Sequence, residues 1–275
     1  MTGVVELAEA PPLGALYRRA ALGLLTRHTG TGLPDTTLVL RDVGIERDRL
    51  GRYAKLCGYR LSDTLPPPYP HVLAFPLAVA LMAERDFPFP VIGVVHVANR
   101  IEVLRPIDAG ERLELTVRAA DLRDHERGRA FDIRATASVG DEVVWRGVST
   151  YLRKEKPGTG KPEGGPTDGI RWRVGRTVGT DYAKVSGDRN PIHTSRLAAR
   201  AFGYKGPIAH GMWSAARCLA ALEGRLPPQH TFDVTFRRPL VLPARVCFSA
   251  TQGDHWELAL RDARTGAPHL TGTVT

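Results

Sequence analysis

One order of elements is written twice along this 275-residue chain, and the repeat limits the folds open to it. The segment Tyr53–Gly58 reads Tyr-Ala-Lys-Leu-Cys-Gly, and Tyr182–Gly187 reads Tyr-Ala-Lys-Val-Ser-Gly, 129 residues later. The dipeptide Arg105-Pro106 returns as Arg238-Pro239 at a spacing of 133 residues. Two matched blocks in the same order indicate a duplicated unit in which a few residues were gained or lost.

The residues between the two copies form a candidate linker. The stretch from Lys154 to Asp168 is rich in Gly and Pro, and it lacks apolar periodicity and the hydrophobic surface needed to pack. We therefore predict an N-terminal domain over residues 1–153, a flexible Gly/Pro-rich linker over residues 154–169 and a C-terminal domain over residues 170–275.

Each copy is expected to hold one apolar helix and four strands. The helices are predicted from Pro76 to Glu84 and from Ile208 to Glu223, with Gly224 as a C-terminal cap. Because the second helix is apolar on nearly every face, other elements must enclose it. Alternation predicts strands at residues 101–104, 112–117, 130–135 and 143–152, and again at 231–236, 245–250, 256–261 and 269–274. Val139 to Glu142 is a predicted hairpin turn.

The composition narrows the class of protein. No run of about 18 apolar residues is present, so no membrane span is expected. The segment from Leu13 to His28 is predicted to be an amphipathic helix, since arginines interrupt its apolar residues and no cleavage site follows. Cys57, Cys218 and Cys247 lack metal-ligand spacing, and we expect buried thiols in a reducing compartment, the cytoplasm.

The net charge of +9 bears on the partners. The basic residues are scattered and no aromatic-interleaved basic stripe is present, so no nucleic-acid partner is expected. A polyanionic small ligand or an acidic carrier protein at the rim of a pocket fits this charge better.

The second copy carries the densest set of proton-handling groups. Residues 186–193 read Ser-Gly-Asp-Arg-Asn-Pro-Ile-His, and residues 208–212 read Ile-Ala-His-Gly-Met. Pro191 disfavours a helix before it, so we expect a turn, rather than a helix face, to present Asp188, Asn190 and His193.

The first copy serves as an internal control for this chemistry. At a spacing of 129 residues, Tyr59, Leu61 and Thr64 stand where the second copy has the acid, the amide and the imidazole. None of them can replace its counterpart, and residues 69–73 lack the Ala-His-Gly-Met sequence. We therefore predict one active site per chain, with the first copy as scaffold and pocket wall.

The blocks Tyr-Ala-x-x-Ser-Gly-Asp-x-Asn-Pro-Ile-His and Ile-Ala-His-Gly-Met resemble the MaoC-like, R-specific enoyl-CoA hydratase (hydratase 2) family. The resemblance implies an α+β double hot-dog fold, in which two curved antiparallel sheets, each wrapped around a central helix, pair into one continuous sheet. A tandem chain of this kind forms within itself the dimer that shorter members build from two copies. A monomeric pseudo-dimer or a homodimer is therefore expected.

The same resemblance implies a hydro-lyase without metal or cofactor. Such enzymes hydrate trans-2-enoyl thioesters of coenzyme A or acyl carrier protein to (3R)-hydroxyacyl thioesters, or run the reverse dehydration, in fatty-acid metabolism. The catalytic residues would be Asp188 and His193, which activate the water jointly, with Asn190 as a further hydrogen-bond partner. The backbone N–H of Gly211, at the start of the apolar helix, would donate to the thioester oxygen. The division of proton transfers between Asp188 and His193 stays open.

Other residues of the two blocks are candidates for substrate binding: Ser186, Pro191, His210 and Met212. For His210 a structural hydrogen bond is the alternative. The remaining histidines are interpreted as surface or core residues: His28, His71, His96, His125, His230, His255 and His269.

Two other functions stay open at this point. One is an acyl-thioester-binding subunit without turnover, and the other is a hot-dog thioesterase that would release a free thiol. The sequence leaves the acyl length, the carrier and the direction of the reaction undetermined.

Overall fold

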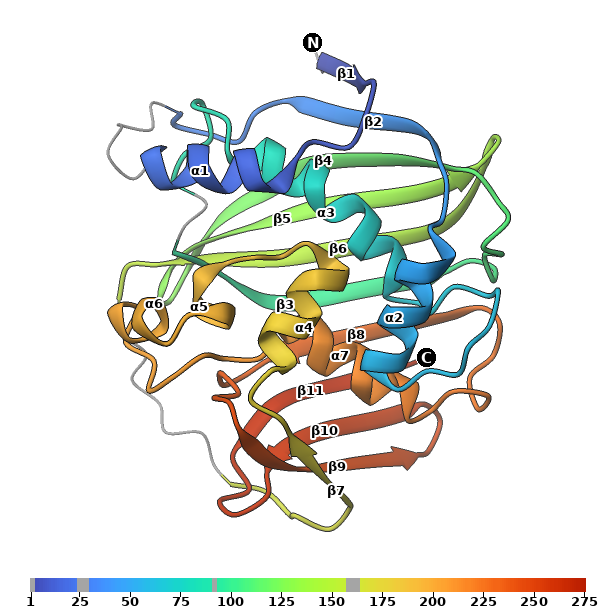
Figure 1. Ribbon diagram of the computed structural model, residues 1–275, viewed down its shortest axis with the longest axis vertical. Helices are drawn as coiled ribbons and strands as arrows, with labels where there is room; N and C mark the ends of the chain where they lie inside the picture. The colour runs from blue at the N-terminus through green and yellow to red at the C-terminus, as the bar shows by residue number, and fades with distance from the viewer. Residues whose placement is uncertain (1–2, 24–29, 91–92, 157–163) are drawn as a thin grey trace.

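Alternating apolar and polar residues in both halves form one sheet of eleven strands in the computed structural model, which describes residues 3–23, 30–90, 93–156 and 164–275 (Figure 1). The strands of the first half are β1 (Gly3–Leu7), β2 (Thr36–Val43), β3 (Val94–Val103), β4 (Leu113–His125), β5 (Gly128–Val139) and β6 (Glu142–Lys154). Those of the second half are β7 (Ile170–Val174), β8 (His230–Phe236), β9 (Ala244–Gln252), β10 (Trp256–Asp262) and β11 (Pro268–Val274).

The helices follow the same division. The first half contains α1 (Leu13–Gly23), α2 (Arg47–Cys57) and α3 (Tyr69–Met82). The second half contains α4 (Val178–Ser186), α5 (Pro191–Thr194), α6 (Arg196–Ala201) and α7 (Gly211–Ala220). In Figure 1, α2, α3, α4 and α7 lie against the same face of the sheet.

The order of the strands repeats with opposite direction about the centre of the sheet. From β2 the order is β2-β4-β5-β6-β3, and from β7 it is β7-β9-β10-β11-β8, with β3 and β8 paired antiparallel at the junction. Arg100 pairs with Asp233 there, and the 133 residues between them equal the spacing found from the sequence. An approximate two-fold axis therefore passes through this pair, and the double hot-dog fold is confirmed.

The two Tyr-Ala-Lys segments lie in equivalent helices, α2 and α4. Each helix ends at a glycine in the left-handed region, Gly58 at φ 83° and Gly187 at φ 81°. Their N–H groups donate to the carbonyls of Ala54 and Ala183, which is the usual C-terminal cap. The chain thus leaves both helices in the same way, but the glycine is followed directly by Asp188 in the second half and by Tyr59 in the first.

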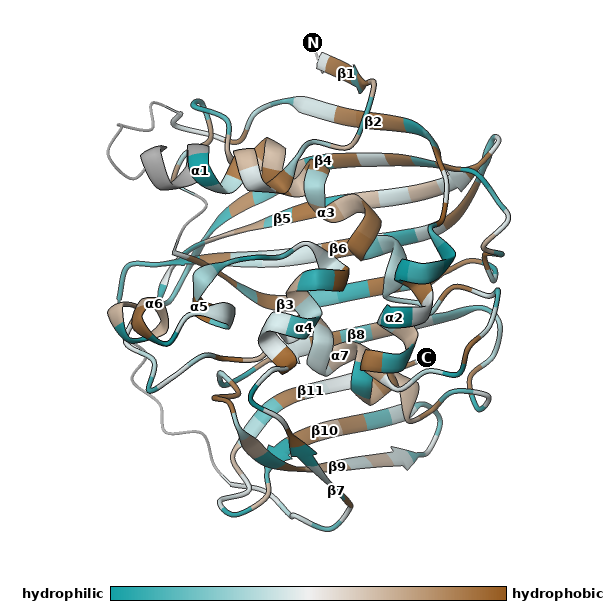
Figure 2. Ribbon diagram, viewed as in Figure 1, coloured by the Kyte–Doolittle hydropathy of each residue, from teal (hydrophilic) through white to brown (hydrophobic). Residues whose placement is uncertain are grey.

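The predicted start of the first apolar helix at Pro76 is wrong. Helix α3 begins at Tyr69 and ends at Met82, with Pro70 in its first turn, where proline is favoured, and Pro76 in its interior. Proline costs an intrahelical hydrogen bond, yet α3 is mostly apolar (Figure 2) and most of its residues are buried, so packing outweighs that loss. His71 consequently lies in the first turn of the helix.

The second apolar helix is shorter than predicted. Residues 208–210 are extended because Ile208 bridges Val241 and the Ala209 N–H donates to the carbonyl of Leu240 at 2.8 Å. Helix α7 ends at Ala220, and Gly224, at φ 78°, follows after further turns.

The eight predicted strands and the hairpin are present, most of the strands longer than expected. Strands β1, β2 and β7 were not predicted, and Lys154, the first residue of the predicted linker, is the last residue of β6. Residues 157–163 of the linker and 24–28 of the N-terminal helix lie outside the described residues.

One hydrophobic core runs through both halves. Tyr53 of α2 lies between Tyr69 of α3 and Tyr182 of α4, at ring-centroid distances of 5.0 Å and 6.1 Å. The first half therefore packs directly on the helix that leads to the acidic loop. Among the described residues, no helix is long and apolar enough to cross a membrane.

Candidate active site

The loop after α4 is fixed by Ser186. Its hydroxyl donates to the carbonyl of Tyr182 at 2.8 Å and accepts the N–H of Asp188 at 3.1 Å. Because both partners belong to the chain itself, Ser186 holds the loop in place, although it also lies in the wall of the cavity described below.

A one-turn helix, rather than the predicted turn, presents the imidazole. Asn190 caps α5 by accepting the N–H of Ile192 at 3.3 Å, and Pro191 takes the first helical position. Both residue types are favoured at these positions, so Pro191 begins a helix here instead of preventing one. The side-chain oxygen of Asn190 accepts the hydrogen bond of this cap, and its side-chain amide nitrogen is left to donate to other partners.

The two oxygens of the Asp188 carboxylate have different surroundings. Oδ1 accepts the hydroxyl of Tyr17 at 2.6 Å and the N–H of Asn190 at 3.1 Å. Oδ2 lies 3.7 Å from Nε2 of His210, and 23% of the Asp188 side chain is exposed. Oδ1 is thus held by two hydrogen bonds, whereas Oδ2 has the longer contact with His210.

The tautomer of His193 follows from its hydrogen bond. Nδ1 lies 2.8 Å from the carbonyl oxygen of Ile208, which can only accept, so Nδ1 carries the proton. In the uncharged ring, Nε2 is then free of a proton and can act as a base. The ring of His193 stacks on that of His210, with centroids 3.6 Å apart.

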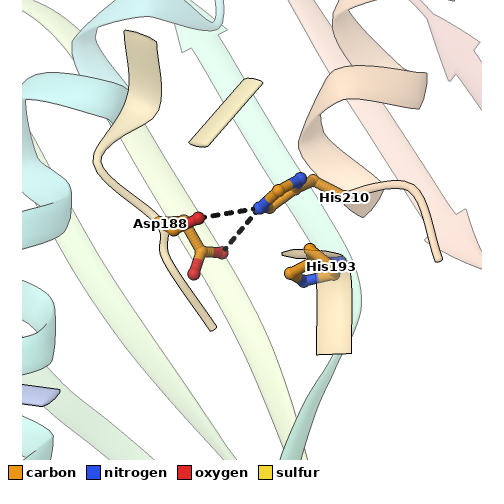
Figure 3. Close-up of side chains that lie close together, drawn as sticks. All are labelled: Asp188, His193 and His210. Atoms are coloured by element: carbon orange, nitrogen blue, oxygen red, sulfur yellow. Dashed lines mark hydrogen bonds and ion pairs between the residues drawn. The ribbon is translucent and has the colours of Figure 1, made fainter. Parts of the chain in front are cut away.

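His210 bonds to the backbone of the acidic loop. Its Nε2 donates to the carbonyl oxygen of Asp188 at 3.0 Å, and its side chain is 3% exposed (Figure 3). This contact favours the structural alternative for His210. It ties the start of α7 to the loop that carries Asp188.

The charges of the three groups follow from their surroundings. Burial would raise the pKa of Asp188, but the positive charge that His210 and His193 gain when protonated in acid, the hydroxyl of Tyr17 and the N–H of Asn190 outweigh it, so this pKa lies below its usual value. Burial lowers the pKa of His193 and lowers that of His210 to about 3. At neutral pH the site therefore holds a carboxylate and two uncharged imidazoles.

A cavity of about 440 Å³ opens beside these groups. All eight residues predicted for the site line it: Ser186, Asp188, Asn190, Pro191, His193, His210, Gly211 and Met212. The wall also includes one face of α3 from the first half, namely Val72, Phe75, Val79 and Met82. Both halves thus form a single cavity.

The start of α7 lies in the wall of this cavity. The first N–H groups of a helix have no intrahelical acceptor, and Gly211 is the first residue of α7. A Cβ at Gly211 would lie 3.0 Å from the ring of Phe236, so a side chain there would press on another residue of the cavity wall.

Several wall residues were not expected from the sequence. Tyr17 belongs to α1, which carries no recognisable motif, and its contact with Asp188 spans 171 residues of sequence. His71 and His96 were interpreted as surface or core residues, but both line the cavity, as does His269. No sequence signal marked Tyr17, His71 and His96, because only the pairing of the halves brings these first-half residues to the site.

The same side chains could in principle hold a metal ion. Ligand atoms of Asp188, His193 and His210 lie within 4.8 Å of one another. However, Nδ1 of His193 and Nε2 of His210 each donate a proton to a backbone carbonyl. The arrangement fits acid–base chemistry better than a three-ligand metal site.

Known proteins are similar to this chain in sequence. A family model described as "MaoC like domain" matches residues 172–259. The 3-hydroxyacyl-thioester dehydratase X of Mycobacterium tuberculosis is 37% identical over 267 residues, which cover 93% of this chain and 95% of that protein. An enoyl-CoA hydratase of the same organism is 27% identical over 150 residues, 50% of this chain and 52% of the relative.

The likeness extends to the fold of both halves. A crystal structure of HtdX from Mycobacterium tuberculosis has a TM-score of 0.79 at 37% identity, and the match covers 86% of this chain and 98% of that one. Similarity at this coverage cannot come from the acidic motif alone.

Proposed function

This chain belongs to the MaoC-like dehydratase family, and on that premise we propose that Asp188 and His193 interconvert trans-2-enoyl thioesters and (3R)-hydroxyacyl thioesters. The protein is a hydro-lyase of fatty-acid metabolism. The observation that carries the proposal is the pairing of an ionised carboxylate with an imidazole whose Nε2 is free of a proton, at the wall of one cavity.

Hydration needs a water held at C3 and a base to take its proton. The separation of the Asp188 and His193 atoms is at most 4.8 Å, which one water with two hydrogen bonds can bridge. Either group could take the proton and return it at C2, and the reverse sequence gives dehydration. His210 acts on this pair by fixing the backbone of Asp188.

The thioester oxygen gains negative charge as the reaction proceeds. The N–H of Gly211, at the positive end of α7, would donate to that oxygen without giving up a proton. Such a donor is typically worth about 10² to 10³ in rate.

Tyr17 is a positioning residue in this account. Its hydroxyl donates to Oδ1 of Asp188 at 2.6 Å, which stabilises the carboxylate and leaves Oδ2 for the water. The site would then include a residue of α1, which lies outside residues 172–259 matched by the family model.

The carrier end of the substrate would meet basic side chains. Lys154, Arg237 and Arg238 line the cavity and are exposed. Their charge suits either the phosphates of coenzyme A or an acidic carrier protein. The acyl end would lie along the apolar face of α3, where the missing second site leaves room for a long or bulky chain.

The organisation of the chain completes the proposal. We assign scaffold and pocket wall to residues 1–153, a linker to 154–169 and catalysis to 170–275, with the internal pairing of the halves serving as the dimer, so that a monomer or a homodimer is expected. Cys57, Cys218 and Cys247 are buried free thiols, which is compatible with a reducing compartment such as the cytoplasm.

The experiment is to incubate the purified chain with trans-2-enoyl-CoA of short and long acyl length and to resolve the products by chiral chromatography. We expect (R)-3-hydroxyacyl-CoA from the wild type and from Thr64→Ala, the matched first-half variant, and almost none from folded His193→Ala. Release of free thiol instead would favour a thioesterase. Binding without turnover, on CoA and carrier-protein substrates alike, would favour a binding subunit.

A further inference from the structure

The half without the catalytic residues lines the cavity with polar rings as well as apolar side chains. His71 of α3, His96 of β3 and Tyr151 of β6 all belong to the wall. Their rings form a stack, with centroids 5.9 Å apart for His71 and His96 and 4.8 Å apart for His96 and Tyr151. We call these three residues the polar wall.

A buried pair of side chains supports the polar wall from behind. Nδ2 of Asn99 donates to Oγ of Ser149 at 2.9 Å, and this oxygen lies 3.5 Å from Nδ1 of His71. Asn99 is 2% exposed and Ser149 4% exposed. The contact with Ser149 holds the His71 ring through Nδ1 and leaves Nε2 on the other side of the ring.

The equivalent positions of the second half are apolar. The spacing of 133 residues places Phe232 where the first half has Asn99. Val274 pairs with Phe232 as Ser149 pairs with Asn99. Phe232 is 0% and Val274 2% exposed, so the fold itself accepts a fully apolar pair here. The polar pair is therefore a feature of the non-catalytic half that folding does not require.

The polar wall is uncharged at neutral pH. Burial lowers the pKa of His71 to about 4 and that of His96 to about 3, and burial raises the pKa of Tyr151. Nε2 of His96 is buried and has no hydrogen-bond partner within the part of the chain that the structure describes. Such an atom is costly unless a ligand meets it.

We propose that the polar wall binds an uncharged oxygen substituent, a hydroxyl or a carbonyl, on the acyl chain of the substrate. The inference rests on the proposed function, since it describes the acyl group of that same reaction. Neutral imidazoles can donate and accept, as a hydroxyl does, and a phenol can donate to either oxygen. A carboxylate is disfavoured, because the polar wall offers it no positive charge and the ionised Asp188 faces the same cavity.

The test compares two trans-2-enoyl-CoA substrates of equal length, one ending in a methyl group and one in a hydroxyl group, over several chain lengths. The measured quantity is the ratio of kcat/KM for the hydroxyl substrate to kcat/KM for the methyl substrate within each enzyme, which cancels any general loss of activity. In the wild type, one additional hydrogen bond should raise this ratio about three- to tenfold at the chain length that places the hydroxyl group at the polar wall, compared with the ratio at the other lengths.

Variants assign the preference to the polar wall. His96→Phe keeps a stacking ring and removes the polar atoms, and Ser149→Ala releases His71; both should bring the ratio down to the value seen at the other lengths. Met82→Leu, an apolar change in the same cavity, should keep the wild-type ratio.

The inference is overturned by a wild-type ratio that is the same at every length, or by a preference that survives in both His96→Phe and Ser149→Ala. A carboxyl-ended substrate that outcompetes the hydroxyl substrate would also overturn it. Failure of the proposed function is distinct, because then the methyl substrates are not hydrated at any length.

Discussion

At the scale of single residues, the site depends on how each polar atom is already used. The motif from Asp188 to His193 predicts which groups take part, but the hydrogen bonds decide their roles: Nδ1 of His193 is bound to Ile208, and Nε2 of His210 to the backbone. Tyr17 could not be predicted, because a single tyrosine in a helix has no pattern that points to a carboxylate 171 residues away.

Tyr17→Phe should raise the pKa of Asp188, since the phenol is one of the groups that lower it. The proposed mechanism needs Asp188 ionised, so the acid limb of the kcat/KM profile should move to higher pH. We expect kcat to fall about tenfold near neutral pH and KM to change little. Measured pH–rate profiles of the two enzymes decide this.

Other groups facing Asp188 are left in place by this variant: His210, His193, Tyr151, His71 and His96. Tyr204→Phe removes a different cavity hydroxyl and should leave the acid limb where it is. An unshifted limb in Tyr17→Phe would mean that Tyr17 does not act on the Asp188 carboxylate.

At the scale of elements, alternation predicted eight strands and apolar content predicted both central helices, since a helix or strand facing a core must show this in its sequence. The boundaries were less accurate where tertiary contacts decide. Pro76 continues α3 because the surrounding core holds it, and residues 208–210 stay extended because Ile208 bridges Val241. Strand β7, Ile-Arg-Trp-Arg-Val, lies at the edge of the sheet, and its charged residues kept it from being recognised as a strand in the sequence.

Gly211→Ala tests the role of the start of α7. Its Cβ would meet the ring of Phe236 at 3.0 Å, so the first turn or the ring must shift. We expect kcat to fall about tenfold or more, because the N–H would be misplaced at the thioester oxygen. Steady-state kinetics checks this against Gly175→Ala, where a Cβ meets nothing within 4 Å. Equal activity of the two variants would remove Gly211 from the mechanism.

At the scale of the whole molecule, the halves depend on one another. Strand β8 pairs with β3, and Tyr182 packs on Tyr53 of the first half. Residues 170–275 alone would therefore expose a strand edge and part of the core. We expect this fragment to lack a cooperative urea transition by circular dichroism, whereas the full chain shows one. A fragment that unfolds cooperatively as a monomer would show that the second half is an independent domain.

Buried histidines should make the fold less stable in acid. The pKa values of His71, His96, His193 and His210 are lowered by burial, so below about pH 6.5 the unfolded chain binds more protons than the folded one. The free energy of unfolding should fall as the pH drops from 6.5 toward 4, by up to about 1.4 kcal/mol per pH unit for each group. Urea titrations across this range test it, and His96→Phe should flatten the slope; a stability that rises in acid would contradict the assigned charges.

The central claim is that one site, in the second half, performs the hydration with Asp188 held as a carboxylate. The most direct measurement is the rate at which Asp188→Asn, shown to be folded, hydrates a trans-2-enoyl-CoA that the wild type converts. The account predicts a loss of about 10² to 10⁴ in kcat. A rate near that of the wild type would contradict it, because no carboxylate would then be needed at this position.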